Sequence, residues 1–245
     1  MAAASSRRYD VLKGVPVLRD GPAPVIQPVD HVSNAIDPTI WNWMMECDGP
    51  VLFLGAGATD VRADHIVEVE YNLFRNTDII ADAHFLPLKN NSFKAAVALN
   101  VFEHLSDPAR AAEEIKRVLQ PNGEVLIHTA FMQPLHEAPH HYYNATEFGV
   151  RNWFKGYESV EASVTANFNP AYGVSWLMNE LLIGVENSLG ADARHQLERM
   201  TLNEVSAFWS TRQESSFSRI LTSMPETDVR KFAAGFQLRA RKGNH

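Results

Sequence analysis

The chain has 245 residues, of which 45% are hydrophobic and 21% are charged, and this composition is typical of a folded globular protein rather than a disordered one. Its single cysteine, Cys47, excludes an intramolecular disulfide and a cysteine-based zinc site. A net charge of −7 with scattered basic residues disfavours a nucleic-acid partner, which needs a clustered basic face. There is no secretory signal and no apolar run of roughly 18 residues, so we expect a cytoplasmic protein without a membrane partner.

The first part of the chain is predicted to be an irregular arm followed by a lead-in helix. Prolines and glycines spread over residues 1–37 prevent long helices, and the apolar residues among them favour an extended arm with one short hairpin. Asp37 as N-cap and Pro38 in the first turn predict a helix that runs to Met45.

The next part alternates short apolar runs with a helical pattern. Strands are predicted at residues 50–54, 65–70, 78–81, 93–99 and 124–129, with a helix between the last two that begins at Asp107-Pro108. The run after Pro50 is continuously apolar, which is typical of a parallel strand buried on both faces. Strands that alternate with helices indicate an open α/β sheet with parallel strands.

Beyond residue 130 the pattern changes to longer helices and two isolated strands. We expect a Pro- and His-rich loop first, and then a helix that begins at Thr146 and reaches about Lys155. The remaining predicted elements are a strand at 159–166, two helices over 172–208 separated near Gly190, and a last strand from Ala233 to Arg241.

A glycine turn and two acids follow three consecutive predicted strands. Ligands of open α/β sheets bind at the carboxyl ends of the strands, and the first strand ends in Gly55-Ala56-Gly57. A dinucleotide site is disfavoured, because Asp60 stands where the third glycine of that motif is expected and its carboxylate would repel a diphosphate. The alternative ligand has a ribose, an adenine and a cationic amino-acid tail.

The second and third strands supply what such a ligand needs. Glu70 ends the second strand and can accept hydrogen bonds from two ribose hydroxyls, and the ring of Tyr71 can cover the adenine. Asp82 follows the third strand and can accept from the adenine amino group, with the backbone amide of Ala83 beside it.

Five stretches resemble the class I S-adenosylmethionine-dependent methyltransferases, in the branch that contains many small-molecule and glycan methylation enzymes. They are Val51-Leu-Phe-Leu-Gly-Ala-Gly57, Ala81-Asp-Ala-His-Phe-Leu-Pro-Leu88, Asn91-Ser-Phe-Lys-Ala-Ala-Val97, Asn100-Val-Phe-Glu-His104 and Glu114-Ile-Lys-Arg-Val-Leu-Gln-Pro-Asn-Gly123. The resemblance implies a Rossmann-like fold with a mostly parallel seven-stranded sheet, a C-terminal antiparallel hairpin and a helical insertion. The expected organisation is an arm and lead-in helix at residues 1–48 and a methyltransferase domain at 49–245, with the insertion at about 170–225.

The resemblance also implies a cofactor, S-adenosyl-L-methionine, and assigns residues to it. By position, Gly55, Ala56 and Gly57 flank the methionine part together with Asn100. Glu70 then contacts the ribose, and Asp82 with Ala83 contacts the adenine, which the ring of Tyr71 can cover. The start of the chain, residues 9–18, is similar to the final strand pair of a small zinc ribbon, but its cysteines are absent here.

Several positions depart from the family pattern. Phe53 stands where the family usually has an acid that holds the methionine ammonium, and Thr59 and Lys94 replace a common Gly and Asp. Only 15 residues separate Gly55 from Glu70, so the helices that normally flank the second strand are expected to be loops. One face of the sheet is then left bare, and the apolar lead-in is predicted to cover it.

A histidine-rich loop follows the fifth strand at the ligand end of the sheet. Residues 136–140 spell H-E-x-x-H, but Pro139 disfavours the helix that a zinc protease needs. His136, His140 and His141 are instead candidate acid/base groups, because imidazole titrates near neutral pH. A structural loop and a metal site through His136, Glu137 and His140 are the alternatives, and our prediction assigns no metal.

These observations predict an enzyme that moves a methyl group from S-adenosyl-L-methionine to an oxygen or nitrogen of a small-molecule acceptor. The alternative is a non-catalytic binding module or partner subunit with the same fold, which Phe53 favours and the intact acids Glu70 and Asp82 oppose. The long helices beyond residue 172 are candidates for a lid or for the interface of a homodimer.

Overall fold

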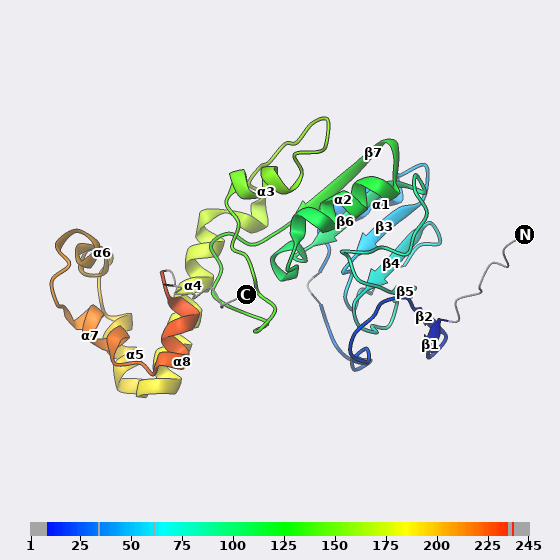
Figure 1. Ribbon diagram of the computed structural model, residues 1–245. Coiled ribbons are helices and arrows are strands. Elements are labelled where there is room, and N and C mark those ends of the chain that lie inside the picture. The colour runs from blue at the N-terminus through cyan, green and yellow to red at the C-terminus, as the bar shows by residue number, and fades with distance from the viewer. Residues whose placement is uncertain (1–8, 34, 61, 235–236, 238–245) are drawn as a thin grey trace, which may run out of the picture. The chain divides into compact units, whose positions relative to one another are not determined.

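The computed structural model describes residues 9–33, 35–60, 62–234 and 237, which form two compact units (Figure 1). The first unit comprises residues 1–131 and 140–162, and the second comprises 132–139 and 163–245. The strands of the first unit are β1 (Asp10–Leu12), β2 (Val15–Val17), β3 (Val51–Leu54), β4 (Ile66–Glu70), β5 (Ile79–Ile80), β6 (Phe93–Leu99) and β7 (Leu119–His128). Its helices are α1 (Pro38–Met45), η1 (Phe102–His104), α2 (Pro108–Val118) and α3 (Glu147–Trp153).

The seven strands form one sheet in the order β1-β2-β5-β4-β3-β6-β7. All neighbouring pairs are parallel except β1 and β2, so the prediction of a mostly parallel seven-stranded α/β sheet is confirmed. The antiparallel pair, however, lies at the N-terminal end of the chain and not at the C-terminal end. Ala233 and Ala234 are not in a strand, and residues 235–236 and 238–241 of the predicted last strand lie outside the described residues.

The N-terminal hairpin extends the sheet beyond β5. Lys13 and Gly14 both have positive φ angles, 49° and 88°, as the two-residue turns that match the twist of a hairpin require. Val17 of β2 pairs with Ile80 of β5, and the amide of Leu18 donates to the carbonyl of Ile80 over 2.8 Å. The short hairpin predicted in the arm is therefore present, and it anchors the start of the chain to the sheet.

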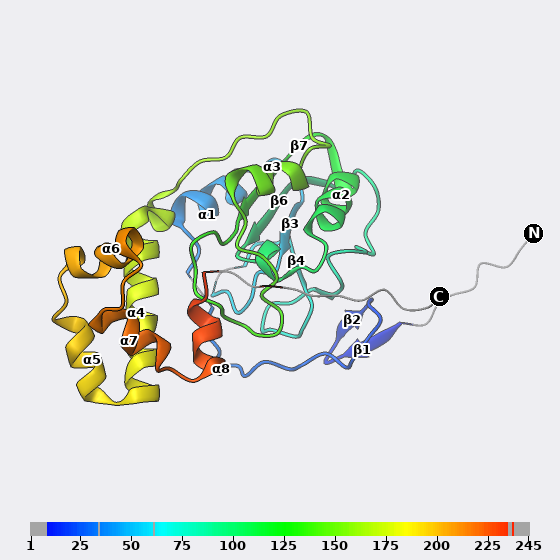
Figure 2. The same ribbon diagram turned by 60° about the vertical axis from the view of Figure 1, so that its left-hand side comes forward.

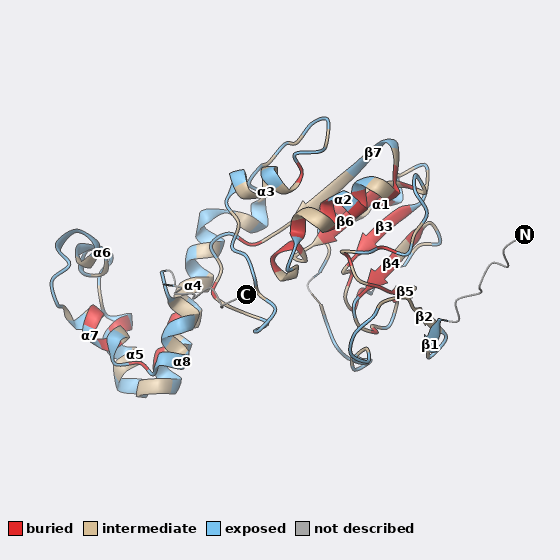
Figure 3. Cartoon of the chain, viewed as in Figure 1, coloured by how far each residue is buried: buried red, intermediate tan, exposed pale blue. Residues whose placement is uncertain are grey.

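Each face of the sheet is covered by helices that the sequence predicted. On one face, α2 packs its Ala111, Ala112, Ile115 and Val118 against the strands, and α3 adds partly buried side chains. On the other face, Ile40 and Met44 of α1 pack against β3, β4 and β6, which confirms the lead-in as the cover of this face. Buried residues gather in the central strands and on the inner side of α2 (Figure 3).

Both covering helices begin at an aspartate followed by a proline. The Asp37 carboxylate accepts from the amide of Thr39 over 2.7 Å, and the Asp107 carboxylate accepts from the amide of Arg110 over 3.1 Å. These bonds satisfy amides that have no partner inside the helix. Thus the start of each helix agrees with the sequence prediction.

Among the described residues, no helix connects β3 to β4 or β4 to β5. Residues 55–65 and 71–78 are turns and loops in the described chain, as the short spacing predicted. Two hydrogen bonds join the loop at 71–78 to the loop at 55–65. Arg75 donates to the carbonyl of Ala58 over 2.9 Å, and the Asn76 side chain donates to the carbonyl of Thr59 over 2.9 Å.

The second unit is helical in its described residues (Figure 2). Its elements are η2 (Ala166–Phe168), α4 (Pro170–Leu189), α5 (Ala191–Glu198), α6 (Leu202–Thr211), α7 (Ser216–Thr222), α8 (Glu226–Val229) and η3 (Arg230–Phe232). Leu181 and Val185 of α4 pack with Leu197, Ile220 and Met224 to form its core. Among the described residues, no helix is both long and apolar enough to cross a membrane.

Two sequence predictions in this part of the chain are wrong. Residues 159–165 form no strand, because they pair with none of the strands that the structure describes. The second helix predicted after Gly190 is two helices, because a capping box at Thr201 and Glu204 starts α6 after α5 has ended.

The packing of α1 on the sheet predicts a large difference between two adjacent methionines. Met44 is fully buried and Met45 is 44% exposed. Replacing Met44 with Ala should lower the free energy of unfolding by about 2–5 kcal/mol, because it leaves a cavity under the sheet. The matched variant Met45→Ala should stay within about 0.5 kcal/mol of the parent. Urea denaturation measures both, and equal effects would show that α1 does not close this face.

Candidate functional site

Four neighbouring parallel strands bring the predicted cofactor residues to one edge of the sheet. The turn after β3 holds Gly55 to Gly57, and Glu70 is the last residue of β4. Asp82 follows β5 and Asn100 follows β6. Because β5, β4, β3 and β6 lie side by side and run in the same direction, their carboxyl ends form one continuous rim. The predicted grouping of these residues is thus present at the level of the backbone.

The glycine turn has backbone angles and close contacts that favour glycine. Gly55 and Gly57 have φ angles of 67° and 69°. A Cβ atom on Gly55 would lie 2.3 Å from Cγ2 of Val101, and one on Gly57 would lie 2.3 Å from Oγ of Ser33. Val101, shortly after β6, therefore packs closely against the turn at Gly55, and Ser33 of the N-terminal arm packs against it at Gly57.

Glu70 lies under this turn. One carboxylate oxygen, Oε1, accepts a hydrogen bond from the amide of Gly57, and the residue is only 7% exposed. Burial raises the pKa of Glu70 to about 8, the Gly57 amide opposes this rise, and the nearby Glu68 adds to it. The acid predicted to bind a ribose thus stabilises the glycine turn of its own chain.

Glu68 is a second buried acid on β4 that the sequence analysis missed. It is 2% exposed, its Oε1 accepts from Oγ1 of Thr59 over 3.1 Å, and its buried Oε2 has no hydrogen-bond partner among the described residues. Burial raises the pKa of Glu68 to about 7, and the carboxylate of Asp78 adds to the rise while Arg62 opposes it. Residue alternation could have revealed it, because positions 68 and 70 share one face of a strand.

Tyr71 is covered by the arm. The guanidinium carbon of Arg19 lies 3.7 Å above the centre of the Tyr71 ring, and Arg19 Nε donates to the Tyr71 carbonyl over 2.9 Å. A cation above the ring face is attracted by its quadrupole. The ring that was predicted to cover an adenine is thus already stacked on one face by a side chain of the same unit.

Asp82 is more accessible than the two glutamates, with one third of its side chain exposed. Its Oδ1 accepts from the amide of His84 over 2.9 Å and lies 2.6 Å from Nδ1 of the same histidine. The amide of Asp107 donates to Nε2 of His84 over 3.1 Å, so the ring proton is on Nδ1 and points at Asp82. Ala83 beside it is buried.

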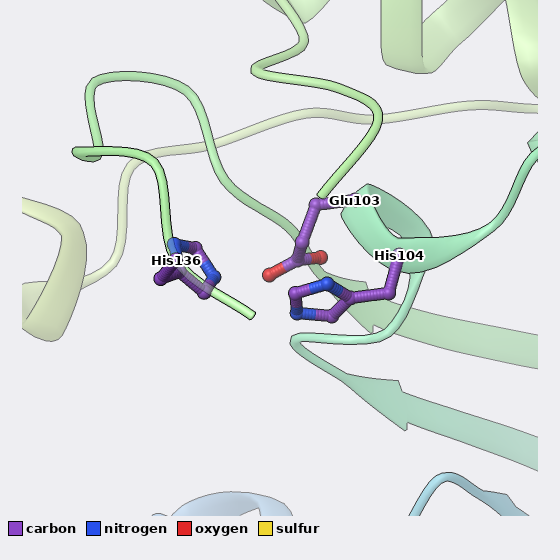
Figure 4. A group of neighbouring side chains, drawn as sticks. All are labelled: Glu103, His104 and His136. Atoms are coloured by element: carbon purple, nitrogen blue, oxygen red, sulfur yellow. The ribbon is translucent and has the colours of Figure 1, made fainter. Parts of the chain in front are cut away.

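The end of β6 places a buried acid and a histidine next to Asn100. Asn100 has a φ angle of 56°, and its amide donates to the carbonyl of His128 over 2.9 Å. Glu103 and His104 follow in η1, and Figure 4 shows both side chains at this turn. Oε2 of the buried Glu103 accepts from Oγ1 of Thr129 over 3.0 Å.

The loop after residue 140 folds back on η1. The amides of Tyr142 and Tyr143 donate to the Glu103 carbonyl over 2.8 and 3.2 Å, and Nδ1 of His104 lies 3.0 Å from the carbonyl of His140. A carbonyl can only accept, so the proton of neutral His104 is on Nδ1 and its Nε2 carries the lone pair. Glu103 and His104 therefore lie beside Asn100 at the end of β6, and the sequence analysis did not select them.

Of the three predicted catalytic histidines, two lie in the first unit. The rings of His141 and His104 are 5.7 Å apart, and Nε2 of His141 lies 3.1 Å from the Tyr143 carbonyl. His140 is exposed, with its Nδ1 3.4 Å from the hydroxyl of Tyr142. Because the Tyr143 carbonyl can only accept, the proton of neutral His141 is on Nε2 and its lone pair is on Nδ1.

His136 belongs to the second unit. Its Nδ1 lies 2.9 Å from the carbonyl of Pro134, and its ring centre lies 5.7 Å from that of Trp176. Residues 136–140 are not helical, which agrees with the argument from Pro139 against a zinc-protease motif. The structure therefore does not group the three predicted histidines within one unit.

Comparisons with known proteins identify the central part of the first unit. Residues 58–127 match the family described as methyltransferase domain. An "Uncharacterized methyltransferase" of Mycobacteroides abscessus is 32% identical over 83 residues, which cover 34% of this chain and 29% of that protein. The tRNA U34 carboxymethyltransferase of Campylobacter fetus is 30% identical over 113 residues, 40% of each chain. This chain thus spans less than half the length of these relatives.

Solved structures give a more distant likeness. A SAM-dependent methyltransferase from Aquifex aeolicus is 16% identical and superimposes with a TM-score of 0.37, covering 49% of this chain and 78% of that one.

The two raised carboxyl pKa values predict how stability depends on pH. Each carboxyl binds its proton more tightly in the folded chain than in the unfolded chain, whose value is 4.5. Their contribution to stability is therefore full below about pH 4.5 and is lost as pH rises through about 7 and 8. The slope for each group is at most about 1.4 kcal/mol per pH unit.

The variants Glu68→Gln and Glu70→Gln should each lose less stability than the parent as pH rises, because an amide does not titrate. Urea midpoints at half-unit intervals from pH 5 to 8.5 measure the slope for the parent and both variants. Burial lowers the pKa of His128 from 6.5, which acts in the opposite sense, so each variant is compared with the parent at the same pH. Parallel curves for all three proteins would show that neither acid is protonated in the folded chain at neutral pH.

Proposed function

We propose that this chain, whose residues 58–127 match the methyltransferase domain family, is a class I S-adenosylmethionine-dependent enzyme that transfers a methyl group to an oxygen or nitrogen of a small molecule. The observation that carries the proposal is the series of residues along one rim: a glycine turn after β3, an acid at the end of β4 and an acid after β5. Three neighbouring strands end in groups that suit the three parts of one ligand.

The residues present fit S-adenosylmethionine by their chemistry. Glu70 and Asp82 offer carboxylate oxygens for hydroxyl and amino donors, and the Asp82 side chain is one third exposed. Glu70 has to exchange the Gly57 amide for ligand hydroxyls, since it is only 7% exposed. Its raised pKa of about 8 adds a requirement, because a protonated carboxyl accepts hydrogen bonds less well than a carboxylate.

When bound, the cofactor supplies an activated methyl group on a sulfonium. The protein then has to orient the two reactants and exclude competing water, and orientation alone contributes up to about 7–11 kcal/mol in ideal cases. A positioned base that takes the acceptor's proton adds about 10²–10⁴-fold. The candidates for this base are His136, His140 and His141, and we add His104.

His104 is the best supported of these histidines. It follows the strand that ends at Asn100, and its Nδ1 is held by the His140 carbonyl, which leaves the lone pair on Nε2. A hydrogen bond that fixes the orientation of a histidine ring positions it for proton transfer to or from a reactant.

A small acceptor is favoured over a nucleic acid. The chain has a net charge of −7, whereas nucleic-acid sites need clustered basic residues. One relative is named for a tRNA substrate, which is a property of that relative. The charge of this chain does not support assigning it a tRNA substrate.

A second candidate function is a non-catalytic binding subunit. Phe53 favours it, because this side chain is 2% exposed and packs with α1 where the family usually has an acid for the cofactor's ammonium. Measuring cofactor binding separates the two candidates.

Binding of S-adenosylhomocysteine tests the proposal and the place of Glu70. At 100 times its dissociation constant the ligand should stabilise the protein by about 2.7 kcal/mol. Glu70→Gln should weaken binding at least tenfold, because hydrogen bonds to a charged group contribute about 1.5–3 kcal/mol each. The control Glu113→Gln, on the exposed side of α2, should leave the affinity unchanged. Isothermal titration calorimetry measures the three affinities, and no binding to the parent would exclude the enzyme.

Single variants identify the base once an acceptor is known. Replacing the responsible histidine with Gln should lower the turnover rate about 10²–10⁴-fold and leave S-adenosylhomocysteine affinity unchanged. The set is His104, His136, His140 and His141, and the control is the exposed His195 of α5. Normal turnover in all four variants would show that the loop and η1 have a structural role only.

A further inference from the structure

The N-terminal arm, defined here by the described residues 18–33 and 35–36, runs along the rim that carries the proposed cofactor site. It leaves the hairpin at Leu18 beside β5 and reaches α1 at Asp37 (Figure 1). In between it pairs with the segment that follows Glu70: the amide of Leu73 donates to the Val25 carbonyl, and the amide of Gln27 donates to the Leu73 carbonyl, each over 2.9 Å. The arm thus lies across the carboxyl ends of the central strands.

Two side chains of the arm contact residues of the proposed site directly. Arg19 stacks on the ring of Tyr71 at 3.7 Å. At the other end of the arm, Oγ of Ser33 accepts from the amide of Ala58 over 2.8 Å and packs against Gly57. Arg75 supports this contact by donating to the Ala58 carbonyl.

The backbone amides of Gly57 and Ala58 therefore already have hydrogen-bond partners within the protein. Glu70 takes the amide of Gly57, and Ser33 takes the amide of Ala58. A ligand that bonds to Glu70 has to displace the first contact. A ligand that lies on the turn has to displace Ser33, because its Oγ already lies 2.3 Å from the place of a Cβ on Gly57.

The arm is weakly held compared with the strands that it crosses. None of its described residues is buried, and Val29 and Val32 are 82% and 76% exposed. Segments with few buried contacts open at low free-energy cost while the core stays folded. The strands beneath the arm, in contrast, are buried almost throughout.

We propose that the arm is a gate over the cofactor site and that the Ser33–Ala58 hydrogen bond is its latch. In the closed state, Ser33 and Glu70 satisfy the turn's amides and Arg19 covers Tyr71. S-adenosylmethionine enters when Ser33 leaves the turn, and its binding energy is reduced by the cost of opening. This inference rests on the proposed function, because it concerns access to the same site.

The alternative is that the arm is a fixed wall of the site. In that case Ser33 supports the ligand, and its hydroxyl is needed for binding. The two roles predict opposite effects of removing the hydroxyl, because a latch competes with the ligand and a wall assists it.

The test compares Ser33→Ala with Val32→Ala, a control at the exposed neighbouring position. A hydrogen bond of this kind contributes a factor of roughly 2–12 to an equilibrium. Ser33→Ala should therefore bind S-adenosylhomocysteine roughly 2–12 times more tightly, with the gain in the association rate. Val32→Ala should match the parent. Stopped-flow tryptophan fluorescence gives the association rates and calorimetry gives the affinities.

A second variant, Arg19→Ala, releases the other end of the arm and should change the affinity in the same direction. Hydrogen exchange of the Ala58 amide in the ligand-free proteins should be faster in Ser33→Ala than in the parent, which reports the latch without any ligand. Thermal melting of each variant confirms that the fold is intact.

The outcomes separate the gate from the proposed function. Tighter binding by Ser33→Ala, or binding by this variant alone, supports the gate. Equal or weaker binding by Ser33→Ala overturns the gate and leaves the methyltransferase proposal standing. Absence of binding in the parent and in both variants overturns the proposed function, and the gate with it.

Discussion

The arrangement of the site depends on one short connection, the loop between β3 and β4, which has no helix of its own to satisfy its amides. Backbone donors that are removed from water need a partner, and here the partners are side chains from outside the loop. Glu70 accepts from the amide of Gly57 and Ser33 accepts from the amide of Ala58, while Glu68 accepts from the side-chain hydroxyl of Thr59. The two acids of β4 and one residue of the arm thus take over the structural role of a missing helix.

This arrangement has an electrostatic cost. Two carboxyl groups on one face of β4 are buried with few cations near them, and burial disfavours their charged forms. Two ion pairs, Arg62 with Asp78 and Arg75 with Asp60, hold the loop but form no salt bridge with either glutamate among the described residues. Burial therefore favours the protonated forms of both acids, whereas the proposed ribose contact favours the carboxylate form of Glu70. Structure and binding make opposite demands on the same group.

The sequence predicted those features that are encoded by local signals. The glycine turn, the aspartate and proline at the start of each covering helix and the apolar runs of β3 and β6 all act within a few residues, and the predicted strands and helices of the sheet are confirmed there. The loss of two connecting helices also followed from spacing alone. These features require no knowledge of which segments meet in space.

The features that the sequence did not predict depend on contacts between distant segments. Arg19 meets Tyr71 and Ser33 meets Ala58 across 52 and 25 residues, and no local pattern marks either pair. Residues 159–165 have the alternation of a strand, but a strand also needs a neighbour, and the described chain offers none. His104 lies in a recognised motif, yet its fixed tautomer depends on the carbonyl of His140, 36 residues away.

The arm is held at both ends, by β2 in the sheet at one side and at the other by α1, whose Ile40 and Met44 are buried. A segment with two fixed ends loses little entropy when it settles back, because its ends are already close to their final places. Chain segments of about ten residues close within about 10–100 ns. In the proposed gate, the two fixed ends therefore favour rapid closing, and the arm would spend little time in the open state.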